Sequence, residues 1–378
     1  MWVQESVPLV LAAAIGLALA SSAASAADAV AWPGAGWDAK LGKPYEEWKP
    51  VREVLVELAG RAGVKQVTFA VEPKGDFVVP LPAELTIREA LQKAASIHSL
   101  EAAWEGGGLV IRQAARGTSW ASVLGAELRA ITVGEHRGAV YLPRGRKGSG
   151  PVPWVWYAPN GLAPSNAWMV KRLLDAGVAV ASVNVGESQG NPAGRAVFTA
   201  FHEKAVKELA LTRKAVLLPQ SRGGLMLYNW AAEHPELVAA VGGIYTVCDL
   251  RSYPGMKKAA EAYGLSEAEL EKVLPDHNPI DRLAPLVKAG VPIFHIHGDK
   301  DGTVPLEKNA GELVKRYQAL GGTASLQIIP GGGHEVTARF FQNREMVEFL
   351  LKQALAQAAR ESGAGAAPVR PSGEKRGK

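Results

Sequence analysis

Three residues of this 378-residue sequence carry side chains that could take part in one reaction: Ser221, Asp301 and His334. A serine hydroxyl is a weak nucleophile until an adjacent base accepts its proton. An imidazole that a carboxylate holds in the right tautomer is the usual base. Each of the three residues follows an apolar run and lies among glycines or prolines. These segments predict nucleophilic catalysis if the fold brings the three side chains together.

The serine lies between two apolar runs. Residues 215–219 read Ala-Val-Leu-Leu-Pro, and Ser221 is followed by Arg222, Gly223 and Gly224. This pattern predicts a buried strand, a tight turn and the start of a helix. It resembles the nucleophile elbow of α/β-hydrolases, although Pro219 stands where that motif usually has a glycine. An ordinary Ser-Arg-Gly-Gly turn is the alternative for this segment alone.

The acid and the base follow two further predicted strands. The segment 295–305, His-Ile-His-Gly-Asp-Lys-Asp-Gly-Thr-Val-Pro, resembles the acid loop of the same family and places the acid on Asp301. Asp299 then becomes a hydrogen-bonding neighbour, and it is the alternative acid. His334 follows Pro330 and three glycines, and it matches the family's histidine. The order Ser221, Asp301, His334 is the chain order of α/β-hydrolases.

The resemblance also implies an oxyanion hole. The backbone N–H groups of Leu162 and Arg222 would be its donors, and Asn160, Gly161 and Tyr245 would contact the substrate. Asn160 stands where many members have a histidine, so a plain Pro-Asn-Gly turn is the alternative for this loop. Further candidates for the pocket wall are Arg195, Phe198, Phe201 and the side chain of Arg222.

The elements that must position these residues alternate between strand and helix from Val152 onward. Apolar strands are expected at 155–157, 178–185, 215–218, 239–245, 292–297 and 324–329, and helices at 167–176, 200–212 and 345–359. Alternation of this kind predicts a doubly wound α/β domain with a mostly parallel sheet, at residues 116–360. Residues 249–290 leave the pattern as a small helical cap over the site or as a surface excursion.

A small α+β domain is predicted before it, at residues 50–115, after an irregular lead-in at 27–49. Helices are expected at 51–62 and after Thr86, which with Glu89 forms a capping box. Strands are expected at 66–71 and 77–81, with a hairpin through 102–111. This order resembles the short N-terminal domain of secretins and TonB-dependent receptors. The resemblance implies an envelope protein as a binding partner of this module.

Both chain ends carry signals of their own. The apolar run from Val7 to Ala20 and the small residues Ala24-Ser25-Ala26 predict a signal peptide at 1–26, and therefore a secreted or periplasmic protein. Residues 1–6 contain no lysine or arginine, which leaves membrane anchoring open. The tail at 361–378, predicted to be disordered, contains four cations, Arg370, Lys375, Arg376 and Lys378, and contributes to the net charge of +5. No aromatic residues are interspersed among its cations, so no nucleic-acid site is expected. Cys248 is the single cysteine, which excludes an intramolecular disulfide.

These signals together favour an exported serine hydrolase that cleaves a small-molecule or carbohydrate-linked carboxylic ester through an acyl-enzyme, with neither metal nor cofactor. Similar acid loops occur in dienelactone hydrolases and prolyl-oligopeptidase-like peptidases, so peptide, thioester and lactone substrates stay open. A rival hypothesis is a binuclear metal site that begins at His295, His297 and Asp299. Another is a non-catalytic envelope binding protein on a hydrolase scaffold, which the departures at Pro219 and Asn160 would favour.

Overall fold

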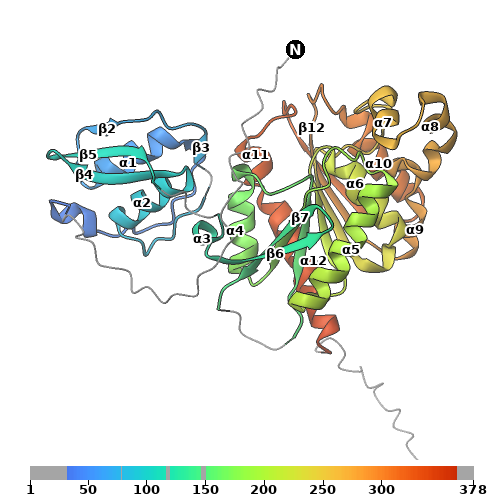
Figure 1. The fold of residues 1–378 in the computed structure, drawn as a ribbon, viewed down its shortest axis with the longest axis horizontal. Coiled ribbons are helices and arrows are strands. Elements are labelled where there is room, and N and C mark those ends of the chain that lie inside the picture. Colours follow the sequence, from blue (N-terminus) through green and yellow to red (C-terminus); the bar gives the residue numbers. More distant parts are fainter. Residues whose placement is uncertain (1–31, 78, 116–119, 146–149, 364–378) are drawn as a thin grey trace, which may run out of the picture.

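A computed structural model of the protein describes residues 32–77, 79–115, 120–145 and 150–363. Figure 1 shows a small N-terminal part and a larger part built around a twisted sheet. The predicted signal peptide and nearly all of the basic tail lie outside the described residues. Within the described ranges, no helix has both the length and the apolar character needed to cross a membrane.

The large sheet has the strand order β13-β12-β11-β10-β8-β9-β7-β6. All neighbouring pairs are parallel except the two that β7 makes, with β6 and with β9. The central strands are buried along their whole length because helices cover both faces. The bounds are β6 Ala126–Val133, β7 His136–Pro143, β8 Trp154–Ala158, β9 Ala179–Val183, β10 Ala215–Pro219, β11 Val238–Ile244, β12 Ile293–Gly298 and β13 Ala324–Ile329.

The β6–β7 hairpin is an element that the sequence prediction lacked, since that prediction began the sheet at Val152. The two strands pair along their full length and turn at Gly134, whose φ is +56°. β6 lies at the sheet edge and much of it is exposed. Its polar residues interrupt the sequence, so β6 lacks the unbroken apolar run by which the buried strands were predicted.

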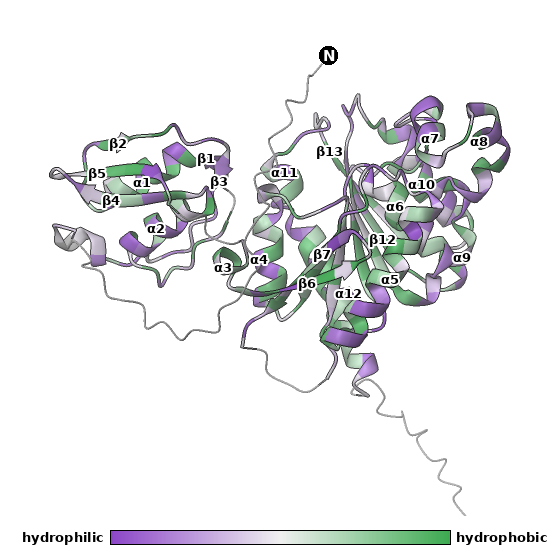
Figure 2. Ribbon diagram, viewed as in Figure 1, coloured by the Kyte–Doolittle hydropathy of each residue, from purple (hydrophilic) through white to green (hydrophobic). Residues whose placement is uncertain are grey.

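Two layers of helices enclose the sheet. One face is covered by α4 Ala167–Asp175 and α12 Arg344–Glu361, and the other by α5 Pro192–Leu209, α6 Gly223–Glu233, α9 Ala284–Lys288 and α10 Ala310–Ala319. Figure 2 shows hydrophilic residues on the outward side of helices such as α9 and α12. Helix α5 begins at Pro192 rather than near residue 200, because the Asn191 side chain caps it and proline suits a first helical turn.

The N-terminal part contains α1 Val51–Arg61, α2 Ile87–Ile97 and a sheet in the order β2-β5-β4, from Val67–Phe69, Gly108–Gln113 and Leu100–Glu105. The capping box is present, since the backbone N–H of Glu89 donates to Thr86 Oγ1 and the N–H of Thr86 donates to Glu89 Oε2. The strand expected at 77–81 is instead β3 Asp76–Phe77, which pairs with β1 Lys49–Pro50. Pro80 and Pro82 lack the N–H groups that would continue it.

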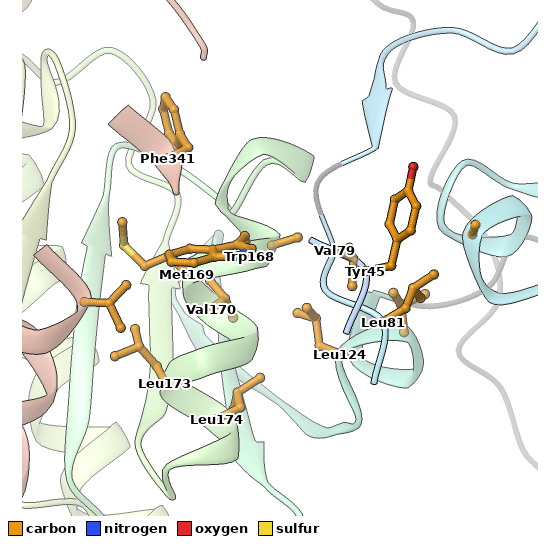
Figure 3. Close-up of a cluster of buried hydrophobic side chains, with 14 of the residues drawn as sticks. Tyr45, Val79, Leu81, Leu124, Trp168, Met169, Val170, Leu173, Leu174 and Phe341 are labelled. Atoms are coloured by element: carbon orange, nitrogen blue, oxygen red, sulfur yellow. The ribbon is translucent and has the colours of Figure 1, made fainter. Parts of the chain in front are cut away.

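A shared apolar core joins the two parts. Figure 3 shows Val79 and Leu81 of the N-terminal part beside Leu124, which belongs to α3 Trp120–Leu124, and Trp168 of α4. All four side chains are buried. The mostly parallel sheet with helices on both faces, preceded by a small α+β part, confirms the predicted fold class.

Candidate active site

The candidate residues all follow the carboxyl ends of parallel strands, which meet at one edge of the sheet. Ser221 follows β10, Tyr245 follows β11, Asp301 follows β12, and His334 follows β13. Residues 159–162 follow β8, the strand beside β10. Residues far apart in the sequence are therefore gathered above one edge of the sheet.

Ser221 occupies a strained turn between β10 and α6. Its φ of +50° lies in the left-handed region that non-glycine residues rarely adopt. The turn is held on both sides, because Ser221 N donates to Ile244 O at 3.0 Å and Val247 N donates to Ser221 O at 2.8 Å. Pro219 is accommodated as the last residue of β10, paired with Ala158. This anchoring keeps the hydroxyl clear of the sheet.

Glycine after the serine allows a close approach of helix and strand. A Cβ on Gly223 would lie 2.2 Å from Ala158 O, and one on Gly224 would lie 2.1 Å from Val247 O. Both contacts are with backbone atoms, which cannot move aside as a flexible side chain can. Helix α6 can therefore begin directly against β8 and against the segment after β11, because these two positions carry no side chain.

Three side chains form a continuous hydrogen-bonded line. Ser221 Oγ lies 2.9 Å from His334 Nε2, and His334 Nδ1 lies 2.8 Å from Asp301 Oδ2. Since an ionised carboxylate can only accept, Nδ1 carries the imidazole proton and Nε2 presents its lone pair to the serine hydroxyl. This arrangement can draw a proton from the serine as its oxygen attacks a carbonyl carbon.

Asp301 is held as a carboxylate by several donors. Its side chain is fully buried, and Oδ1 accepts hydrogen bonds from the backbone N–H groups of Thr303 at 3.0 Å and Val304 at 2.8 Å. His297 Nε2 lies 3.3 Å from Oδ2, beside the bond from His334. Burial alone would raise the pKa of Asp301, but the hydrogen bonds from His297, His334 and Val304 outweigh it and hold that pKa well below its usual value.

Asp299 links the acid loop to the loop at residues 330–337 that carries His334, here called the histidine loop. Its Oδ1 accepts a hydrogen bond from Gly331 N at 2.6 Å, and Lys300 N donates to Gly332 O at 2.9 Å. A Cβ on Gly298 would lie 2.1 Å from Gly332 O, so the two loops are in close contact. Asp299 thus binds the loop backbone, whereas Asp301 binds the imidazole.

Tyr245 backs the imidazole of His334. The two ring centroids are 4.4 Å apart, and the tyrosine is only 2% exposed. Gln220, the residue before the serine, donates from Nε2 to Tyr245 Oη at 2.9 Å and accepts from Tyr157 Oη at 2.8 Å. Burial raises the pKa of Tyr245 well above its usual value, so the phenol stays neutral. The structure therefore places Tyr245 as a support behind the histidine, and its burial leaves little surface for the substrate contact expected from sequence.

The loop after β8 runs beside the serine turn, since Gln220 N donates to Ala158 O at 2.8 Å. Asn160 has a φ of +54°, Gly161 is exposed, and Leu162 is half-buried. Within the described residues, the N–H groups of Leu162 and Arg222 donate to no other protein atom. Both N–H groups therefore remain available to a ligand.

The Arg222 side chain has a partner of its own, because its Nε lies 2.7 Å from Glu187 Oε2. The remaining wall candidates lie elsewhere. Phe198 and Phe201 of α5 pack against Trp156 in the core, with ring centroids 5.1 and 5.5 Å away. Arg195, also on α5, pairs with Glu233 at 2.9 Å. These three candidates for the pocket wall thus contact Trp156 of the sheet or Glu233 of α6 instead.

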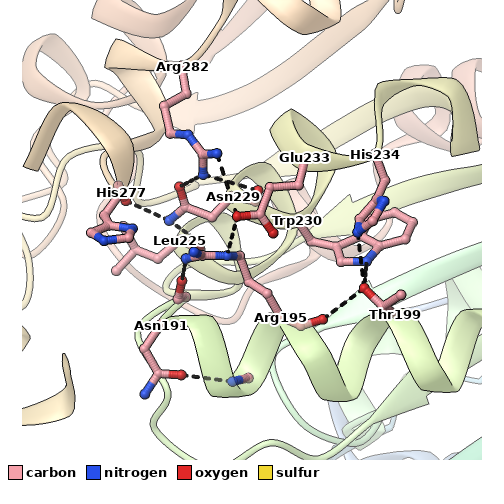
Figure 4. Close-up of polar contacts among 12 residues, drawn as sticks. Asn191, Arg195, Thr199, Leu225, Asn229, Trp230, Glu233, His234, His277 and Arg282 are labelled. Carbon is pink, nitrogen blue, oxygen red and sulfur yellow. Dashed lines mark hydrogen bonds and ion pairs between the residues drawn. The ribbon is translucent and has the colours of Figure 1, made fainter. Parts of the chain in front are cut away.

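A polar network joins α5 and α6 to residues 277–282 of the excursion at 249–290. Figure 4 shows Arg195 of α5 and Arg282 converging on Glu233 of α6. Asn229 of α6 accepts from Arg282 Nη1 at 3.1 Å and donates to His277 O at 2.6 Å. Burial of two cations is tolerated here because each has a carboxylate or carbonyl partner. The network anchors residues 277–282 to α6.

The excursion between β11 and β12 contains α7 Met256–Tyr263 and α8 Glu267–Val273. Its apolar residues pack with Leu225 of α6 and with Val304, three residues beyond Asp301. The excursion is thus a small helical layer beside the acid loop, built on its own hydrophobic cluster.

The three residues of the rival metal site, His295, His297 and Asp299, each bond to a different protein partner. His295 is fully buried, and its Nε2 lies 2.6 Å from Tyr228 Oη. Burial lowers the pKa of His295 to about 3. His297 bonds to Val304 O at 2.8 Å and lies against Asp301, while Asp299 holds Gly331. In the part of the chain that the structure describes, no three His, Cys, Asp or Glu side chains are placed to hold a metal ion.

Sequence comparison matches residues 198–357 to the prolyl oligopeptidase family. This range contains the serine turn, the acid loop and the histidine loop, and it excludes the N-terminal part and the loop after β8. No curated protein sequence matches the chain.

Three solved structures that match the chain are distant from it in sequence. A prolyl endopeptidase is 19% identical, with a TM-score of 0.51 over 68% of this chain and 42% of its own. The acylaminoacyl peptidase of Pyrococcus horikoshii is 17% identical, with a TM-score of 0.50 over 68% of this chain and 47% of its own. Porphyromonas gingivalis dipeptidyl peptidase 4 is 14% identical, with a TM-score of 0.49 over 60% and 35%. Each match spans less than half of the longer chain. The likeness to the prolyl endopeptidase and the acylaminoacyl peptidase supports the α/β-hydrolase fold.

Proposed function

We propose that this protein is a serine hydrolase in which Ser221 is the nucleophile, His334 the general base and Asp301 the residue that orients the base. The observation that carries the proposal is the continuous line of hydrogen bonds at 2.9 and 2.8 Å from the serine hydroxyl to the buried carboxylate. The left-handed backbone of Ser221 on the turn between β10 and α6 supports the proposal, because a nucleophile on such a turn is exposed to substrate.

The reaction proceeds in two halves. Ser221 Oγ attacks the carbonyl carbon of the substrate while its proton passes to His334 Nε2, and the imidazolium is stabilised by Asp301. The developing oxyanion accepts hydrogen bonds from the N–H groups of Leu162 and Arg222. His334 then gives the proton to the leaving alcohol or amine, which leaves an acyl group on Ser221. Water, deprotonated by His334, attacks the acyl-enzyme and releases the acid.

A carboxylic ester of a small molecule or a carbohydrate is the proposed substrate. The predicted signal peptide supports an extracellular or periplasmic substrate. The second candidate is a peptide bond, which the match of residues 198–357 to the prolyl oligopeptidase family favours. Both substrates use the same three side chains, and they differ only in the leaving group.

A substrate panel separates these candidates. Purified full-length protein would be assayed on p-nitrophenyl esters of increasing acyl length, on sugar acetates, and on aminoacyl-proline anilides, with Ser221→Ala as the control. Turnover of esters but not of anilides, lost in Ser221→Ala, supports the esterase; the reverse preference identifies a peptidase. Turnover that persists in Ser221→Ala would reject the mechanism for both. Complete inactivity, together with a serine that no acylating reagent modifies, would favour the non-catalytic binding protein.

A further inference from the structure

The N-terminal part contacts the catalytic part through the segment Tyr45–Trp48. The carbonyl oxygen of Glu46 accepts a hydrogen bond from Gln342 Nε2 at 3.1 Å. The Glu46 carboxylate pairs with Arg172 of α4, and it lies 3.5 Å from Arg344 Nη2 at the start of α12. Trp48 packs against Phe341, with ring centroids 6.4 Å apart. Several of these contacts therefore fall on the short stretch from Phe341 to Arg344.

That stretch ends the loop that carries the general base. Helix α11 Ala338–Phe341 begins just after His334. The ring of Phe341 lies 6.1 Å from the ring of Tyr245, which in turn lies 4.4 Å from the imidazole of His334. Aromatic rings at these separations are in packing contact. A row of rings thus connects Trp48 of the N-terminal part to His334.

The histidine loop is irregular, and side chains near its two ends hold it: Asp299 accepts from Gly331 N, and Arg339 Nη1 donates to Pro330 O at 2.7 Å. Between Pro330 and α11 the chain has no regular structure, and Glu335 and Val336 are exposed. Helix α11 has only four residues, and a helix so short does not hold its shape without tertiary contacts. The Asp299 bond to Gly331 fixes one end of the loop. The N-terminal part supplies contacts at the other end.

We propose that the N-terminal part is a built-in positioning element of the active site, in which Trp48 and Glu46 hold α11 and thereby keep His334 in line with Ser221. This inference rests on the proposed function, because it assigns the docked domain a role in the same reaction. Trp48 and Glu46 are positioning residues, since neither touches the three reacting side chains. Loss of their contacts should slow acylation without weakening substrate binding.

Trp48→Ala in the full-length protein tests the proposal, with Trp48→Phe as the conservative variant and Phe69→Ala as the matched control. Phe69 is a half-buried aromatic residue of the same part, and it stacks under Arg52 at 4.1 Å rather than on α11. The readouts are kcat and KM for an ester, the rate at which a fluorophosphonate labels Ser221, and the thermal midpoint.

For Trp48→Ala we expect kcat and the labelling rate to fall on the order of tenfold, less than the hundredfold that a 1 Å misplacement of a catalytic group can cost. KM should be unchanged, Trp48→Phe should restore most of the rate, and Phe69→Ala should lower the thermal midpoint without slowing labelling.

Equal kcat and labelling rates in Trp48→Ala and wild type would overturn the proposal, as would an equal slowing in Phe69→Ala. If Trp48→Ala does not fold, Trp48→Leu replaces it, with the same expectations. Failure of the proposed function is distinguishable, because wild-type protein would then be neither active nor labelled. A labelled, active wild type with an unaffected Trp48→Ala would refute the positioning role alone.

Discussion

Asp301→Asn distinguishes the orienting acid from its neighbour Asp299 more sharply than any other substitution. In the wild type, Oδ1 of Asp301 accepts from two backbone N–H groups, and Oδ2 faces His334 Nδ1 at 2.8 Å and His297 Nε2 at 3.3 Å. Asparagine has one acceptor oxygen in place of two. The side-chain N–H group of the substituted amide must therefore point toward a group that, in the wild type, donates a hydrogen bond to Asp301.

The two orientations of the amide have different costs. With the oxygen kept toward the backbone, the amide N–H group faces His334 and forces the imidazole proton onto Nε2, where it meets Ser221 and cannot act as a base. With the amide reversed, its N–H group opposes the N–H groups of Thr303 and Val304. The first orientation is the wrong-tautomer state that lowers kcat by ~10⁴-fold in trypsin, about 5 kcal/mol of transition-state stabilisation.

The assay is kcat/KM for an ester substrate, with thermal unfolding to show that the variant is folded. Asp299→Asn is the matched control, because an asparagine oxygen can still accept the hydrogen bond from Gly331 N, and activity should stay within roughly twofold of wild type. Near-normal activity in Asp301→Asn combined with a large loss in Asp299→Asn would refute the assignment and move the acid to Asp299.

Further substitutions test the other parts of the site. Gln220→Leu leaves the hydroxyls of two buried tyrosines without their partner, at about 1–3 kcal/mol each, so both the thermal midpoint and kcat should fall, whereas Gln220→Glu should retain more of each. Gly223→Ala should give little folded protein because its Cβ would lie 2.2 Å from Ala158 O, while Gly302→Ala, which meets nothing within 4 Å, should fold and turn over ester normally. Arg222→Ala should keep kcat within about tenfold of wild type if the donor is the backbone N–H group, since one lost donor typically costs 100-fold or more; a larger loss would assign the role to the guanidinium. The free energy of unfolding should fall as the pH drops below about 4, because the hydrogen bonds to Asp301 outweigh burial and lower its pKa only in the folded state, and Asp301→Asn should flatten that slope.

The parallel core was predictable because its strands are buried on both faces and therefore read as unbroken apolar runs. β8, β9 and β10 are examples, and each is followed by a glycine- or proline-rich turn. The edge hairpin β6–β7 was not predictable by the same rule, because an edge strand exposes side chains to water. Helix α5 was predicted to begin several residues too far along the sequence, because Asn191 as N-cap and Pro192 in the first turn were not used as a helix start signal.

Some residues of the candidate site could likewise be predicted from local sequence, and others could not. Ser221, Asp301 and His334 could be named from the turns around them, and the structure brings their side chains together. His297 and Gln220 were missed as supports, because their partners come from other segments and only the folded chain reveals them. Gln220 could have been noticed as the residue next to the nucleophile. The link from Trp48 to the histidine loop depends on domain docking, which no local pattern encodes.

The most direct test of the account is the mass of the protein after treatment with a fluorophosphonate, followed by peptide mapping. The account predicts one covalent adduct, located on Ser221, which is absent in Ser221→Ala and forms far more slowly in His334→Ala. A folded protein that hydrolyses its substrate yet takes up no adduct at Ser221, or that is labelled equally fast without His334, would contradict it.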